Sequence, residues 1–310
     1  MFILVTYFCP HGAHAPDSRC SSCKVTGYCS REHQPSDWAS HKTICNDIKC
    51  SRAKMEKVER KLRTLPGNSA SSLGNPFETS FGHFGSTVCT RPYMVARITY
   101  AVQLLSSNSH DAAAIALEIS RGSLDLCRRD LLGARSAMPN LYLRLGQDQK
   151  CYDFIKGWED MSVPFLNSEN EDIMEGVSMF CGRRLIAPYS LAVALIKVRM
   201  LLDLREVRAS SVLLGVDKIN VDILQHIREN MDLRSSICDK IETLEHQTDQ
   251  LFAAIHKANK YLWRAIVGPG DSLPLMDWEG NVEVAAVLSL SDGKCWEETN
   301  GAFRWIQKKL

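Results

Sequence analysis

After residue 9, no segment of about 18 residues in this 310-residue chain is free of charge, whereas a membrane-spanning helix needs about 20 apolar residues. The run from Met1 to Cys9 is apolar, but it is short and has no basic start, unlike a secretory signal. The net charge is only +1, which argues against a dominant nucleic-acid or membrane binder. We therefore expect a soluble intracellular protein of the cytoplasm or nucleus, with no membrane partner.

Catalytic motifs are also missing. The sequence contains no glycine-rich phosphate loop, no Walker lysine motif and no metalloprotease helix. Asp148, Lys150, Tyr152 and Asp153 lie close together in sequence, but no nucleophile, base and orienting group can be named among them. We predict that the protein is not an enzyme.

The 12 cysteines are distributed unevenly. Five fall in the first 45 residues, and seven are scattered singly through the rest. A secreted disulfide framework would pair cysteines along the whole chain. This distribution instead indicates an intracellular metal module followed by a helical body whose cysteines are buried thiols.

The cysteines of residues 20–45 belong to three pairs of potential metal ligands. The first pair is separated by two residues, the spacing with which a zinc knuckle presents two thiolates to one ion. The members of the other pairs are four residues apart, so each pair can lie on one face of a helical turn. So short a segment cannot fold on apolar burial alone, whereas a structural zinc ion contributes about 10–16 kcal/mol of apparent binding free energy. The pairs are Cys20 and Cys23, Cys29 and His33, and His41 and Cys45.

This segment resembles a MYND-type zinc finger, which binds two zinc ions in an interleaved arrangement. Besides the cysteine spacing, the resemblance rests on Tyr28-Cys29-Ser30, Gln34, Trp38 and His41-Lys42. The resemblance implies a complete zinc site, with no position left open for a substrate. Its ligands would be Cys20, Cys23, His41 and Cys45.

The second site that the resemblance implies departs from the family pattern. Cys29 and His33 map onto its middle pair, with histidine in place of the more usual cysteine. Cys9 fits the first position of the leading pair, but Gly12 stands where its partner is expected. Either a nearby histidine substitutes, or Cys9 is the second member of the pair and Thr6 occupies the lost position. The candidate histidines are His11 and His14.

The family typically binds short proline-containing motifs of partner proteins, and an aromatic groove suits such an extended peptide. Trp38 forms the miniature core between the metal clusters, supplies the wall of this groove, or does both. Gln34 is the second candidate peptide contact. We assign residues 9–45 to this finger.

Residues 46–65 are predicted to form a basic helix. Lys49 to Arg63 carries seven lysines and arginines but only two glutamates. The helix is either solvated or contacts nucleic acid or an acidic partner; without aromatic residues, nucleic-acid binding would be largely phosphate attraction. Part of the charge should be paired between residues four apart. These pairs are Arg52 and Glu56, Glu56 and Arg60, and Glu59 and Arg63.

The fold class we predict is mainly α, a small two-zinc finger followed by stacked helix hairpins. Residues 66–86 are rich in Gly, Ser, Asn and Pro and form a linker, in which Phe77, Phe81 and Phe84 dock the second half onto the next domain. Residues 87–310 form a helical domain, of the tetratricopeptide kind although the standard signature is not visible. The predicted helices cover 92–107, 111–127, 133–145, 147–158, 188–207, 217–231, 235–265, 281–297 and 300–309.

The order of elements is similar to that of an uncharacterised fungal family with a MYND finger, a basic helix and a helical region. The likeness continues in TRPYMVAR (90–97), LYLRLGQDQKCYDFIKGW (141–158), SLAVALIKVRMLLDL (190–204) and ANKYLW (258–263). It implies no particular activity.

We therefore predict a zinc-binding interaction adaptor whose finger binds a proline-containing motif of a protein partner. The alternative is a DNA-binding transcriptional regulator. A SET-type lysine methyltransferase is less favoured, because in that family catalytic sequence flanks the finger on both sides, and here only eight residues precede Cys9. Acid or a chelator should unfold the finger and spare the helical body.

Overall fold

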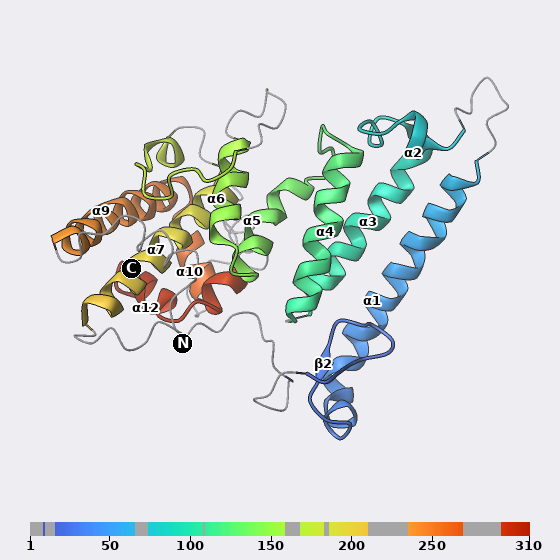
Figure 1. Ribbon diagram of the computed structural model, residues 1–310, viewed down its shortest axis with the longest axis horizontal. Coiled ribbons are helices and arrows are strands. Elements are labelled where there is room, and N and C mark those ends of the chain that lie inside the picture. Colours follow the sequence, from blue (N-terminus) through green and yellow to red (C-terminus); the bar gives the residue numbers. More distant parts are fainter. Residues whose placement is uncertain are drawn as a thin grey trace. The chain divides into compact units, whose positions relative to one another are not determined.

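The computed structural model describes residue 9 and residues 16–65, 74–107, 109–158, 168–182, 186–209, 235–268 and 293–310. This part of the chain is mainly α-helical, as the sequence predicts (Figure 1). It divides into two compact units, with the boundary between residues 141 and 142. Within the described ranges, no helix is both long and apolar enough to cross a membrane.

A small antiparallel sheet and a long helix begin the first unit. Strand β1 (Ser18–Arg19) pairs with β2 (Gly27–Tyr28), so that Ser18 lies opposite Tyr28. Helix α1 (His33–Arg63) follows directly. It runs through the boundary that we placed after residue 45, so the finger and the basic segment share one continuous helix.

Helices α1, α3 (Arg91–Leu105) and α4 (His110–Leu126) pack in this order within the first unit (Figure 1). Pro92 lies in the first turn of α3, where a missing N–H breaks no helical hydrogen bond. Ser109 caps α4 by accepting a hydrogen bond from the backbone N–H of Ala112. The hairpin predicted from 92–107 and 111–127 is confirmed.

Polar side chains tie these three helices together. Arg97 of α3 donates hydrogen bonds to the Ser123 hydroxyl and the Ile119 carbonyl of α4, at 3.0 and 2.9 Å. It also donates to the hydroxyl of Tyr93, which in turn donates to Glu59 of α1. Because the chain of contacts crosses all three helices, α1 is an integral part of this unit.

The second half of the predicted linker docks as expected, with one exception. Phe77, in the short helix α2 (Pro76–Thr79), packs edge-on against the buried Phe84 and Tyr93, at ring distances of 5.0 and 5.5 Å. Phe81 instead is 53% exposed, so its predicted docking is wrong. Residues 66–73 lie outside the described ranges.

Helices α5 (Ala134–Arg144) and α6 (Asp148–Gly157) match the predicted pair at 133–145 and 147–158. Gly146 joins them in the left-handed conformation, with φ of 68°. Glycine adopts this conformation without the steric cost that other residues have. The predicted tight connection at Gly146 is therefore confirmed.

Helix α7 (Ala187–Ala209) packs against α9 (Ser235–Ala258) in the second unit and is buried over most of its length. The single helix predicted over 235–265 is wrong, because α9 ends and α10 (Leu262–Val267) starts after a turn. In that turn the Asn259 side chain accepts the N–H of Tyr261, replacing a helical hydrogen bond. Helix α12 (Ala302–Gln307) matches the one predicted at 300–309. The helix predicted at 217–231 and most of that at 281–297 lie outside the described residues.

Candidate metal centre

The turn between β1 and β2 presents two buried cysteine side chains, Cys20 and Cys23. The backbone N–H of Cys20 donates to the carbonyl of Thr26, and that of Lys24 donates back to Cys20, both at 2.9 Å. The sheet leaves no room for a side chain at Gly27, because a Cβ there would lie 2.5 Å from a carbon of Pro16. The strands can therefore close tightly below the turn and hold the two thiols on one side.

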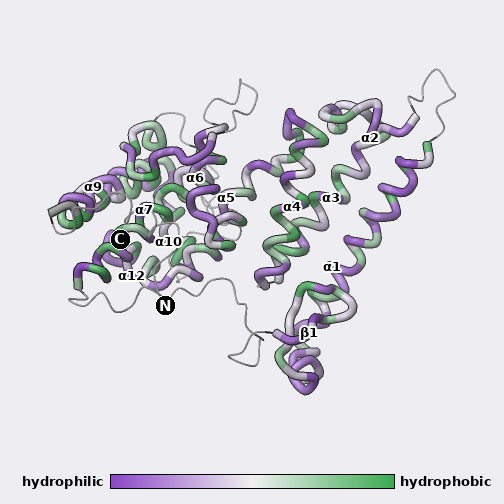
Figure 2. The backbone as a smooth tube through the Cα atoms, viewed as in Figure 1, coloured by the Kyte–Doolittle hydropathy of each residue, from purple (hydrophilic) through white to green (hydrophobic). Residues whose placement is uncertain are grey.

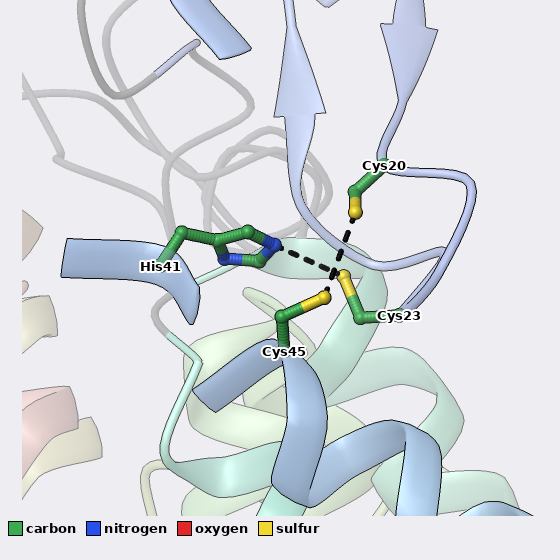
Figure 3. Close-up of side chains that lie close together, drawn as sticks. All are labelled: Cys20, Cys23, His41 and Cys45. Carbon is green, nitrogen blue, oxygen red and sulfur yellow. Dashed lines mark hydrogen bonds between the residues drawn. The ribbon is translucent and has the colours of Figure 1, made fainter. Parts of the chain in front are cut away.

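Helix α1 supplies two more buried ligands one turn apart, His41 and Cys45. The Sγ atoms of Cys20 and Cys45 are 3.7 Å apart, and Cys23 Sγ lies 3.5 Å from Nε2 of His41 (Figure 3). The four ligand atoms all lie within 4.8 Å of one another. The turn and the helix thus bring together the four residues that the sequence pattern singles out.

These distances fit a zinc ion. A tetrahedron with zinc–sulfur arms of about 2.3 Å has edges of about 3.8 Å, and a sulfur–nitrogen edge is about 3.5 Å. Three thiolates and one imidazole are donors that zinc prefers. Cys20, Cys23, His41 and Cys45 would hold the ion, and its role would be structural because the protein fills all four positions.

Neighbouring side chains orient His41. Its Nδ1 lies 3.5 Å from the Thr26 hydroxyl, and its ring packs edge-on against Tyr28. A hydroxyl at Nδ1 favours the tautomer whose Nε2 is free to bind metal. Tyr28 is fully buried, and its hydroxyl donates to Asp37 at 2.8 Å. Tyr28, rather than a tryptophan, is therefore the core residue of the finger.

Electrostatics in this cluster favour a bound cation. Burial opposes ionisation of Cys20, but hydrogen bonds from the Cys23 and Ser22 backbone and from His41 lower the pKa of its thiol to about 7. Burial and the neighbouring sulfur atoms of Cys20 and Cys23 raise the pKa of Cys45 to about 12. Several thiolates in one buried site repel one another, and a divalent ion removes that repulsion.

A second, incomplete cluster consists of Cys9, Cys29 and His33. Both sulfur atoms lie 3.2 Å from Nδ1 of His33, which is the first residue of α1. Cys9 is buried, whereas the other two are half-buried. The candidates His11 and His14, like Thr6 and Gly12, lie outside the described residues, so the structure leaves the fourth ligand open.

Both candidate peptide contacts lie in the first turns of α1. Trp38 is 43% exposed and meets the His41 ring edge-on at 6.3 Å between centroids. It is therefore not the miniature core, which was one of its two interpretations. Gln34, one turn earlier, is half-buried.

Sequence reasoning missed two arginines that hold the finger in place. Arg52 of α1 donates to the carbonyls of Ser22 and Cys23 in the metal-binding turn, at 2.8 and 3.4 Å, and was instead expected to pair with a glutamate. Arg19 of β1 pairs with Asp111 at the start of α4. Neither contact leaves a periodic signal, because the partners are 30 and 92 residues apart.

Comparison with known proteins identifies the finger. A family model for the MYND finger matches residues 7–45. Tudor domain-containing protein 1 of mouse is 53% identical over 81 residues, which are 26% of this chain and 6% of that protein. Egl nine homolog 1 of mouse is 33% identical over 51 residues, which are 16% of this chain and 13% of that protein. The chain thus covers only a small part of either relative, and no solved structure matches it.

The family match and the converging ligands agree on the same segment. A MYND finger is a zinc-binding protein-interaction module, so zinc and a protein partner follow from the match at this general level. Residues 7–45 of this mainly helical chain are a MYND finger.

Proposed function

We propose that the protein is a non-enzymatic adaptor whose MYND finger captures a short proline-containing peptide of a partner protein. The helical part would hold a second partner. The finger is an interaction module, and a zinc ion with four protein ligands has no open position at which a substrate could react. Saturable binding of S-adenosylmethionine by the purified protein would contradict this proposal and revive the methyltransferase alternative.

The exposed ring of Trp38 is the observation that carries the peptide-binding proposal. A large aromatic side chain at the surface is a frequent anchor for peptides, because it offers wide contact area at small entropic cost. Trp38 lies one turn before the ligand His41 and touches its ring. Metal binding would therefore fix the helix turn that presents Trp38 and prepare the anchor before the peptide arrives.

We expect Trp38→Ala to weaken peptide binding at least about tenfold, the loss typical of a truncated aromatic anchor. The measurement is fluorescence polarisation of the zinc-loaded full chain with peptides selected from a proline-containing library. Phe81→Ala, which removes another exposed aromatic ring, serves as the matched control and should leave affinity unchanged within about twofold. Failure of every library peptide to bind a folded, zinc-loaded protein would refute the proposal.

We further propose that the finger holds two zinc ions, the second bound by Cys9, Cys29 and His33 together with His14 or His11. Native mass spectrometry should find two ions in the wild-type chain and one in Cys29→Ser. Of the two histidine variants, His14→Ala and His11→Ala, the one that loses an ion identifies the fourth ligand. A wild-type chain with a single ion would contradict the second site.

A further inference from the structure

The outward face of α1 carries mostly positive charge. Six exposed cations lie along it, and the helix is hydrophilic over most of its length (Figure 2). At a rise of 1.5 Å per residue, these 19 steps span about 28 Å. We call this surface the basic ridge; its residues are Lys42, Lys49, Lys54, Lys57, Arg60 and Lys61.

The ridge charges are not neutralised within the described part of the chain. Of the three ion pairs that the sequence predicts along this helix, the structure forms the one between Arg63 and Glu59, at 2.7 Å. Arg52 turns to the metal-binding turn instead of Glu56. None of the ridge cations has an ion-pair partner among the described residues. Six like charges on one face repel one another, so an anionic partner would be favoured there.

The ridge begins beside the proposed peptide anchor. Lys42, Lys49 and Arg60 follow Trp38 by 4, 11 and 22 residues, which are about one, three and six turns of an α-helix. These side chains therefore lie on nearly the same face as Trp38. Glu56 follows Trp38 by 18 residues, or five turns, so this exposed acidic residue lies on the same line, between Lys49 and Arg60. A peptide held at Trp38 would meet the ridge without leaving α1.

We propose that an acidic segment of the partner, next to the motif held at Trp38, binds along the basic ridge. An extended chain advances about 3.3 Å per residue, so the ridge accommodates about eight or nine residues. Continuity with the peptide anchor favours a peptide over a nucleic acid, because Trp38 is the one aromatic side chain beside the ridge cations and a chain of nucleotides would need several to stack its bases. This inference rests on the proposed function, because the motif brings the acidic segment to the ridge.

The test compares three peptides on the zinc-loaded full chain: a motif selected from the proline-containing library, the same motif with an acidic tail of eight residues, and the motif with a Gly/Ser tail. We expect the acidic tail to raise affinity at least about tenfold at low salt, and this gain to vanish at about 0.5 M salt. The triple variant Lys49→Glu, Lys57→Glu, Arg60→Glu should lose the gain but bind the bare motif as before. A control triple with the same charge change, Lys257→Glu, Arg264→Glu, Lys308→Glu, should keep it.

An acidic tail that adds nothing to the affinity of a motif that binds would overturn this inference and leave the proposed function intact. If no library motif binds, the proposed function fails and the inference with it. Duplex DNA or RNA that binds the ridge more tightly than the acidic peptide, and loses this affinity in the ridge triple, would also overturn the inference. That result would support the nucleic-acid alternative.

Discussion

Replacing Cys45 with serine should unfold the whole first unit, while the same change at Cys50 leaves it folded. Cys45 is a fully buried ligand, whereas Cys50 lies five residues further along the same helix and is exposed. Structural zinc provides about 10–16 kcal/mol of apparent binding free energy, as much as or more than the total stability of about 5–15 kcal/mol typical of a domain. Loss of the complete site therefore removes most of what holds this part of the chain folded.

The structure extends the region that depends on zinc beyond the finger. The sequence alone predicts that a chelator would unfold the finger and spare the helices. However, α1 carries two ligands and also packs on α3, and Arg19 links β1 to Asp111 of α4. Loss of metal should therefore unfold α1, α3 and α4 together, and spare the unit that begins at Tyr142.

Hydrogen–deuterium exchange of the full chain, resolved by peptide, would measure this. Cys45→Ser, or the wild-type chain with excess chelator, should exchange rapidly up to about residue 141 and remain protected in α7 and α9. Cys50→Ser should exchange like the wild type and retain its zinc by native mass spectrometry. Rapid exchange confined to residues 16–45 would show that the finger folds independently, and protection unchanged throughout would show that metal does not stabilise this unit.

Features that depend on residues close together in the sequence could be predicted. The cysteine and histidine spacings identify the ligands because a turn and a helix face have fixed geometry. Pro92 and Gly146 likewise mark a helix start and a helix joint, since each residue suits one backbone conformation. These signals depend only on neighbours a few residues away, and they sufficed for the fold class.

Contacts between distant segments could not be predicted. Arg52 looked like one member of a helical ion pair, yet it binds the carbonyls of a turn 30 residues earlier. The exposure of Trp38 depends on Tyr28 having taken the core position, and an aromatic residue suits either place. The end of α9 is marked by a side-chain hydrogen bond to Asn259, within a helical pattern that continues through it. In each case the local sequence allows more than one arrangement, and contacts with distant parts of the chain determine which one forms.

In the second unit, a single substitution should cause a large loss of stability that does not depend on zinc. Arg199 of α7 is buried and pairs with the buried Asp148 at 2.6 Å. Its guanidinium also donates to the Leu143 carbonyl and the Thr299 hydroxyl, at 3.1 and 3.0 Å. Arg199→Met would leave the carboxylate buried without its cation, which typically costs about 3–5 kcal/mol. We expect urea denaturation to show that the free energy of unfolding of this variant is lower than that of the wild type by this amount.

Arg205→Met is the matched control, because Arg205 lies on the same helix and pairs with Glu245 at 2.7 Å. Both side chains of that pair are at least 40% exposed, so water and salt screen the interaction. Exposed pairs contribute about 0–1 kcal/mol. An equal decrease in the free energy of unfolding in both variants would mean that the buried ion pair of Arg199 stabilises the fold no more than the exposed pair of Arg205.

The decrease in the free energy of unfolding caused by Arg199→Met should also become larger as pH rises. Burial and the charge of Asp148 raise the pKa of Asp203 from its ordinary value of 3.8 to about 8, while Arg199 opposes the shift. A carboxyl with a raised pKa holds a proton in the folded state that the unfolded chain releases, so stability falls as pH rises from about 4 to about 8. Without Arg199 the opposing charge is gone, so the pKa of Asp203 rises further and the fall in stability continues to higher pH. Denaturation at pH 5 and pH 8 should therefore give a larger loss at pH 8; a loss that is the same at both would mean that Arg199 acts through packing and hydrogen bonds rather than through its charge.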